Sequence, residues 1–301
     1  MIPEKAKIKQ PIVAAYLALF MGILFLSLSP LFVRWADAPG VVTSFYRMLI
    51  VSTLLGILSV FHSKDKSQNP NPVKMGRVWM LPVLAGLASG IDHAFWSAAI
   101  ENTLVANVTL LNYVAPLWVS LFAILFMREK YARYFWLALA AVLLGNVIFF
   151  ISQMDFSSRF SLTGEGFAFF SSFFFAGYLI ISQHAQQYFN VRSFLLISSF
   201  AAMILLLVVI LWIGLPLFGY DSQTYLTFLL AGLLSQLGGY FSINFALKQL
   251  PATIVSSTFV LQPVLTVILA AFFEGEGVNA YQILGGILIL CGIYFIKAAK
   301  R

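Results

Sequence analysis

Two stretches of the chain share one pattern: residues 115–129 read APLWVSLFAILFMRE and residues 262–276 read QPVLTVILAAFFEGE. In each stretch a proline, Pro116 or Pro263, lies within an apolar segment and is followed 13 residues later by a glutamate. The copies are 147 residues apart, and the same offset aligns further residues on either side. These further pairs are Ala85 with Gly232, Thr109 with Ser256, and Gly145 with Gly292. The chain therefore contains an internal repeat of about half its length.

The composition requires lipid as the solvent for most of the chain. Hydrophobic residues make up 61% of the 301 positions and charged residues 10%, and the mean hydropathy is +0.93. Soluble domains have roughly 45–50% apolar and about 25% charged residues. A bilayer core needs roughly 20 apolar residues of helix for each span. Runs of that length lie at 12–34, 40–61, 77–99, 104–127, 133–153, 163–183, 193–215, 224–247, 253–273 and 279–297.

The basic residues favour ten spans with both ends of the chain in the cytoplasm. In that arrangement 15 of the 18 Lys and Arg residues fall in segments on the inner side, as the positive-inside rule requires. The outer segments hold Arg34 and Arg159, and Arg47 lies within a span. The net charge of +7 is divided among short segments between apolar runs, so no nucleic-acid partner is expected. We expect a multi-pass protein of the cytoplasmic (inner) membrane.

Each repeat unit contains five spans, and an odd number makes the second copy enter the membrane from the opposite side. The expected fold is an all-α membrane protein with ten transmembrane helices, arranged as two inverted five-helix repeats. The first repeat covers residues 1–153 and the second covers residues 154–301, within one integral membrane domain. Glu129 then falls on the inner side with basic neighbours, whereas Glu276 falls on the outer side without them. Many secondary transporters have this architecture, with a binding site near the interface of the repeats.

Asp92 is the only acidic residue that lies clearly within a predicted span. A charge at the centre of a bilayer costs roughly 2.5–3.5 kcal/mol, so such residues are functional candidates. Asp92 could carry a proton or bind a substrate amine; alternatively, it pairs structurally with Arg47 or caps a helix near the membrane surface. His93 titrates near neutrality when unperturbed, but it is also consistent with a packing role. Trp96 lies one helical turn after Asp92 and could stack on a flat or cationic substrate.

Polar and aromatic side chains surround the two repeat prolines. Proline removes a backbone donor and clashes with the carbonyl four residues earlier, which for Pro116 is the carbonyl of Asn112. The freed carbonyl and the Asn112 amide could line a polar cavity, together with Tyr113 and Trp118. Pro263 would free a carbonyl in the second copy in the same way. Alternatively, both prolines form structural kinks, which lipid tolerates where neighbouring groups satisfy the backbone.

A third set of polar residues lies in the eighth predicted span. Gln236, Tyr240 and Asn244 follow one another at steps of four residues. Residues at that spacing share a helix face, so the three could line the cavity or form hydrogen bonds between helices. No metal site is expected, because the chain has one cysteine and no histidine pair at ligand spacing. No cofactor is expected either, since the chain contains no phosphate-binding glycine loop.

At these residues the chain resembles the EamA-type members of the drug/metabolite transporter superfamily, over nearly its whole length. The resemblance is carried by the two proline-to-glutamate segments, by residues 282–292, and by Arg47 near the start of the second span. Residues 92–116 are similar to a branch with a recurrent Asp, Trp and Asn pattern. Two positions depart from the family: Met-Arg-Glu replaces Leu-Gly-Glu at 127–129, and Met-Gly replaces Trp-Gly at 21–22.

The resemblance implies a ten-helix secondary transporter that works by alternating access. It also implies export of amino acids or related metabolites, with a weaker similarity to the exporters of aromatic amino acids. A carrier of sugar phosphates or nucleotide sugars is the alternative within transporters, although such substrates need cationic groups in the cavity. An intramembrane enzyme is the alternative from another class, and only Asp92 and His93 could serve it. The spacing of Gly86 and Gly90 allows close helix contact, so we expect a monomer or a weak homodimer.

Overall fold

The computed structural model describes residues 12–61, 77–103, 105–151, 162–275 and 277–299 of the chain, and the regular structure of this part is helical. Nine of its helical segments are long and apolar enough to cross a membrane, and the apolar helix Ala280–Ile296 is shorter. Each of the ten predicted spans thus corresponds to an apolar helical segment. Six spans are continuous: α3 (Gly40–Phe61), α4 (Met80–Asn102, after a 3-10 turn at Arg77–Trp79), α7 (Arg133–Phe150), α8 (Leu162–Ala185), α9 (Val191–Ile213) and α14 (Ala280–Ala299).

The remaining four spans are divided into shorter helices. They are α1 (Ile12–Ser27) with α2 (Ser29–Trp35), α5 (Val105–Asn112) with α6 (Ala115–Met127), α10 (Ser222–Leu230) with the π-helix η5 (Ala231–Gly239) and α11 (Tyr240–Leu247), and α12 (Ala252–Phe259) with α13 (Gln262–Glu274). Three of the divisions precede a proline, because α2, α6 and α13 each carry proline as their second residue. Proline is tolerated in the first turn of a helix, where its missing N–H has no partner to lose.

The two proline spans match at the predicted offset. When α5 and α6 are shifted by 147 residues, each of their four bounds coincides with a bound of α12 or α13. The ends of α6 and α13 also agree: Arg128 and Gly275 both cap their helix in the left-handed conformation, with φ of 55° and 71°. The pattern that Pro116 and Pro263 predicted is therefore present as two broken helices rather than two bent ones.

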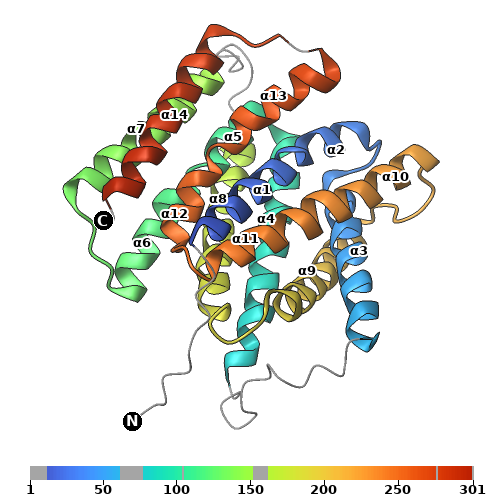
Figure 1. The fold of residues 1–301 in the computed structure, drawn as a ribbon. Helices are drawn as coiled ribbons and strands as arrows, with labels where there is room; N and C mark the ends of the chain where they lie inside the picture. The colour runs from blue at the N-terminus through green and yellow to red at the C-terminus, as the bar shows by residue number, and fades with distance from the viewer. Residues whose placement is uncertain (1–11, 62–76, 104, 152–161, 276, 300–301) are drawn as a thin grey trace, which may run out of the picture.

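α7 and α14 lie side by side along one edge of the molecule (Figure 1). A Cβ added to Gly145 would lie 2.9 Å from the carbonyl oxygen of Gly285, and a Cβ on Gly292 would lie 3.0 Å from that of Ala138. The two contacts are equivalent at the 147-residue offset, and they run in opposite directions along the two helices. Such a self-complementary, antiparallel contact is compatible with two inverted repeats related by a twofold axis.

The interruption of the first span is stabilised by side chains from other helices. The carbonyl of Leu26 accepts a hydrogen bond from Gln262 Nε2 at 3.0 Å, and the carbonyl of Ser27 accepts one from Thr266 Oγ1 at 3.0 Å. The carbonyl of Phe25 accepts one from Ser235 Oγ, also at 3.0 Å. Unpaired backbone groups cost several kcal/mol in lipid, so these hydrogen bonds stabilise the break within a membrane.

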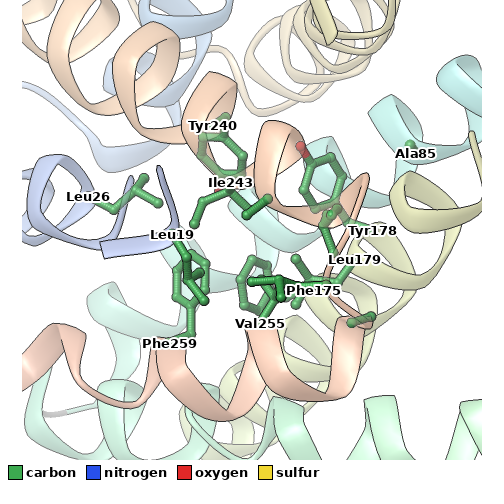
Figure 2. Packing of buried hydrophobic residues seen from close by; sticks show 14 of the residues in the cluster. Leu19, Leu26, Ala85, Phe175, Tyr178, Leu179, Tyr240, Ile243, Val255 and Phe259 are labelled. Carbon is green, nitrogen blue, oxygen red and sulfur yellow. The ribbon is translucent and has the colours of Figure 1, made fainter. Parts of the chain in front are cut away.

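A large apolar cluster fills one end of the helix bundle, near the beginning of α1 and the end of α11. Figure 2 shows side chains of this cluster converging from helices that are far apart in the sequence. They include Leu19 and Leu26 from α1, Ala85 from α4, Phe175, Tyr178 and Leu179 from α8, Tyr240 and Ile243 from α11, and Val255 and Phe259 from α12. Many of these side chains are at most 2% exposed, so this end of the bundle is tightly packed.

Part of the sequence-based topology falls on residues that are not described. Glu276, Arg159 and the basic residues within 1–11, 62–76 and 300–301 lie outside the described residues. The placement of both termini in the cytoplasm, the inner-membrane location and the division into 1–153 and 154–301 stay predictions. Within the described residues, the helix bounds and the α7–α14 contact are compatible with the predicted inverted repeat.

Candidate functional site

A cavity of about 640 Å³ lies beside the apolar cluster and is lined by residues from both predicted repeats. Its walls come from α1 and α2, α3, α4, α5, the end of α7, α8, α11, α12 and α13. Phe175, Tyr240 and Phe259 belong both to the cavity wall and to the apolar cluster, so the cluster closes the cavity at that end. Arg34, which is exposed, lines the cavity near the end of α2. The cavity therefore extends away from the cluster and toward the opposite end of the bundle.

Asp92 lies in the middle of α4, at the cavity wall, and is 7% exposed. Its Oδ1 accepts a hydrogen bond from Ser171 Oγ of α8 at 2.5 Å, and Ser171 Oγ in turn accepts one from Asn112 Nδ2 of α5 at 2.8 Å. Neither structural alternative for Asp92 is present: the residue is not at a helix end, and no ion pair within 4.0 Å joins it to Arg47. Asp92 is thus a buried carboxylate held by neutral partners at the cavity.

His93 and Trp96 share the cavity wall with Asp92. His93 Nδ1 lies 2.8 Å from the Ser89 carbonyl oxygen and 3.8 Å from Asp92 Oδ2. Because the carbonyl can only accept, Nδ1 carries the proton in this arrangement, which leaves Nε2 as an acceptor when the ring is neutral. This region of α4 therefore presents an acceptor, a carboxylate and an indole to the same space.

Arg47 of α3 lines the same cavity and is 4% exposed. Its Nη1 donates to Ser29 Oγ at 2.8 Å, and its Nη2 donates to Gln236 Oε1 at 3.3 Å. Both partners are neutral, and the Nε atom is buried without a hydrogen-bond partner. The guanidinium is charged at any physiological pH, so a full positive charge lies within the spans beside the cavity.

The rest of the lining combines aliphatic side chains with aromatic, amide and hydroxyl groups. Aromatic rings come from Tyr113, Phe149, Phe150, Phe175, Tyr240 and Phe259. Polar side chains come from Ser29, Thr109, Asn112, Gln262 and Thr266. Ligand cavities are typically apolar spaces of roughly 300–1,000 Å³ with a few polar groups that fix orientation, and this cavity fits that description. The described residues hold no group of three or more His, Cys, Asp or Glu side chains that could bind a metal ion.

Comparison with known proteins agrees with this architecture. The sequence profile of the EamA-like transporter family matches residues 13–151 and again residues 162–298. The chain belongs to the EamA-like transporter family. One relative is an uncharacterized transporter of Clostridium kluyveri, 24% identical over 284 residues that cover 92% of this chain and 91% of the relative. Another is an uncharacterized transporter of Synechocystis, 25% identical over 83% of this chain and 74% of the relative.

A solved crystal structure has the same fold as this EamA-family chain. It superposes with a TM-score of 0.78, covers 96% of this chain and 99% of its own, and is 17% identical in sequence. At that identity the likeness concerns the fold alone. The family and the names of the relatives identify the chain as a transporter, and they leave its substrate open.

Six of the nine side chains predicted to bind substrate in this EamA-family chain line the cavity. They are Asp92, His93, Trp96, Asn112, Tyr113 and Tyr240, and the kink residue Pro263 also lines it. Gln236 lies behind the wall as the partner of Arg47. Asn244 is fully buried nearer the apolar cluster, where it accepts from Gln186 Nε2 at 3.1 Å and donates to the Tyr178 hydroxyl at 2.8 Å.

Trp118 and Pro116 are outside the cavity lining. The Trp118 indole donates to Ser172 Oγ at 3.0 Å and packs edge-on against Phe169 and Phe173, in a separate apolar groove between α4, α6 and α8. The expectation of one cavity-lining set around Pro116 treated the span as a single helix. Tyr113 lines the cavity and Trp118 lines the groove, so the two side chains lie on different surfaces of the bundle.

Sequence reasoning missed two polar features of this site and a third that lies outside the cavity lining. Arg47 was considered as a partner for Asp92, as part of the family resemblance and as a cation for anionic substrates, but it was not included among the substrate-binding residues. Ser29, next to Pro30, was not considered at all. Glu165, in the first turn of α8, accepts from Thr103 Oγ1 and Asn107 Nδ2 at 3.1 Å each. Asp92 is therefore not the only carboxylate inside a span, because the predicted span contains Glu165 at its edge.

Proposed function

We propose that this transporter exports amino acids or related metabolites through the central cavity, and that Asp92 binds the amine of the solute. The observation that carries the proposal is a buried carboxylate on the wall of a cavity that also presents several aromatic rings. A buried carboxylate is stabilised by a cation, and an ammonium group supplies one. The aromatic walls favour flat or cationic solutes through stacking and cation–π contact. Aromatic amino acids are therefore the preferred subclass.

Alternating access is the mechanism that the arrangement supports. The apolar cluster of Figure 2 seals the bundle at one end, and the cavity extends toward the other end. Helix interruptions lie around the cavity in four spans, where short helices can rotate against their neighbours. Repacking of the cluster would open the cavity to the opposite side of the membrane while the binding groups remain together.

Counterflow in proteoliposomes tests the proposal. Vesicles that contain the purified transporter and a high internal concentration of one amino acid should accumulate the labelled form of that amino acid from outside. The panel should include aromatic and aliphatic amino acids, organic amines, sugar phosphates and a nucleotide sugar. We expect Asp92→Asn to weaken the competition of amine-bearing solutes for counterflow on the order of 100-fold, with transport retained at saturating solute. Glu101→Gln, at the exposed end of the same helix, is the matched control and should behave as the unaltered protein.

Three results would contradict this proposal in different ways. Counterflow of sugar phosphates without any amino acid would favour the alternative substrate class, for which Arg34 and Arg47 supply cationic groups. Chemical conversion of a solute by the vesicles would favour an intramembrane enzyme. Undiminished amino-acid counterflow in Asp92→Asn would show that Asp92 does not bind the substrate.

A further inference from the structure

Arg47 is a buried cation whose described partners leave its charge unneutralised. Arg47 is 4% exposed, and its guanidinium donates to a hydroxyl and to an amide oxygen, those of Ser29 and Gln236. Its Nε hydrogen is buried without an acceptor. Among the described residues no carboxylate lies within 4.0 Å of it, although Asp92 faces the same cavity. The site thus supplies a positive charge and at least one donor that the protein itself does not use.

An anionic group on a solute is the partner that satisfies both features. Burying an unpaired charge is strongly unfavourable, and buried charges are normally paired. A carboxylate accepts hydrogen bonds on two oxygens and matches the planar fork of a guanidinium, which makes this pairing stronger and more directional than one with lysine. The position of Arg47 on the cavity wall makes it reachable for a bound solute.

The surroundings of Arg47 hold its guanidinium in a fixed orientation. Ser29 is the first residue of α2, directly after the interruption at Leu28. Gln236 lies within the π-helix η5, and it is 2% exposed. Two departures from regular helix geometry, in the first and the eighth spans, therefore meet at this one side chain. π-helical segments occur frequently at functional sites, which agrees with a binding role here.

We propose that Arg47 binds the carboxylate of the transported solute while Asp92 binds its amine, so that the cavity selects zwitterions. The inference rests on the proposed function, because it assigns the second charged contact in the same cavity. A zwitterion neutralises both buried charges at once. An amine without a carboxylate leaves Arg47 unpaired, and a carboxylic acid without an amine leaves Asp92 unpaired. A site with buried polar groups strongly rejects an analogue that lacks the matching polar group, because its own groups are then left unpaired. An apolar pocket discriminates far less between similar solutes.

A phosphate-bearing solute is the competing anion. Arg34 also lines the cavity and would add a second cation, but it is exposed and its charge is screened by water. Asp92 would repel a dianionic phosphate within the same space. A single carboxylate together with an amine fits the deep part of the cavity, where one guanidinium and one carboxylate are present.

The first test compares four matched solutes in counterflow with the unaltered transporter. These are an amino acid that the transporter moves, its methyl ester, its decarboxylated amine, and its N-acetyl derivative. We expect each of the three analogues to compete on the order of 100-fold more weakly than the amino acid, the loss typical of one missing partner at a buried charge. Equal competition by the ester and the acid overturns the zwitterion inference while transport stands. Absence of counterflow for every solute contradicts the proposed function itself, rather than the selection of zwitterions.

The second test assigns the carboxylate contact to Arg47. In Arg47→Gln the preference for the acid over its ester should disappear, because the acid loses its cationic partner and the ester and the amine no longer leave a buried cation unpaired. Retained amine transport shows that the variant is folded. Arg47→Lys keeps the positive charge but loses the planar, bidentate guanidinium. It should therefore still prefer the acid over the ester, with weaker affinity for the acid. This variant provides the test if Arg47→Gln fails to fold. Arg133→Gln, an exposed arginine outside the cavity, is the control. An unchanged acid preference in Arg47→Gln overturns the assignment.

Discussion

At the scale of a single residue, we predict that proton coupling of transport depends on the carboxyl group of Asp92. Its Oδ1 accepts from Ser171, and the cavity gives the side chain a path to water on one side of the membrane. A carboxylate that both binds the substrate amine and exchanges a proton couples the two, because the proton and the amine compete for one site. We expect Asp92→Asn, measured at saturating solute, to lose any dependence of transport on an imposed pH gradient. Asp92→Glu should keep that dependence. A pH-gradient response of normal size in the Asn variant would falsify the coupling role.

Arg128 is strained in a way that the second repeat avoids. It adopts φ of 55° as the left-handed cap of α6, whereas Gly275 occupies the equivalent position of α13. A non-glycine residue pays about 1–2 kcal/mol for this conformation. We expect Arg128→Gly to raise the unfolding free energy by about 1 kcal/mol, seen as a higher Tm in detergent, since glycine offsets part of the gain by its flexibility when unfolded. Arg128→Ala removes the same charge but keeps the strain, so it should give no gain.

The sequence identified charged and aromatic residues more reliably than it identified their surroundings. Asp92, His93 and Trp96 were found because polar groups are rare in apolar spans, and all three line the cavity. Arg47 carried the same signal, yet only the structure shows that its neighbours are neutral. Trp118 does not share the cavity wall with Tyr113: its indole packs in the apolar groove between α4, α6 and α8, a contact between helices that spacing along one span does not reveal.

At the scale of helices, the number and positions of the spans were predictable and their interruptions were only partly so. Pro116 and Pro263 indicated two breaks, and the structure places helix divisions just before them. The π-helix in the eighth span has no comparable sequence signal. It contains Gln236 and changes the phase of this residue relative to Tyr240, whereas Asn244 lies one turn after Tyr240 in the regular helix α11, nearer the apolar cluster. A spacing of four residues predicts a shared face only where the helix is regular.

Close contact between α7 and α14 depends on glycine, which gives a prediction at the scale of one helix pair. A Cβ on Gly285 would lie 2.5 Å from the backbone nitrogen of Phe149 and 2.6 Å from the carbonyl oxygen of Gly145. Backbone atoms cannot move aside, so Gly285→Ala should lower the unfolding free energy by about 1–3 kcal/mol. Gly286→Ala, one residue away, meets only Val264 at 3.5–3.6 Å and should be neutral or stabilising by about 0.5–1 kcal/mol. Thermal unfolding of both variants in the same detergent compares them directly. Equal Tm values would contradict the tight contact.

At the scale of the whole molecule, the two halves share a repeat but differ where charge enters the cavity. The first span is divided before Pro30, whereas α8, its counterpart, is continuous; the eighth span contains η5, whereas α4, its counterpart, is regular. Arg47 contacts both irregular elements through Ser29 and Gln236. Asp92 and Ser171 join the two regular ones. The departures from symmetry thus provide separate supports for the cation and the anion, and these hold the two charges apart within one cavity.

The cavity is closed by the apolar cluster at one end and accessible at the other, and this difference predicts which residues a solvent-borne reagent can reach. Val267 lines the cavity, whereas Val255 is fully buried in the apolar cluster shown in Figure 2. In a background where the exposed Cys291 is replaced by serine, a membrane-impermeant maleimide should label Val267→Cys from the side predicted to be outside. Val255→Cys should resist the reagent on both sides, because the cluster excludes water. The two variants exchange one small side chain for another, so differences in labelling rate report access rather than damage. Faster labelling of Val255→Cys, from the side predicted to be cytoplasmic, would mean that the resting transporter opens through the cluster rather than away from it.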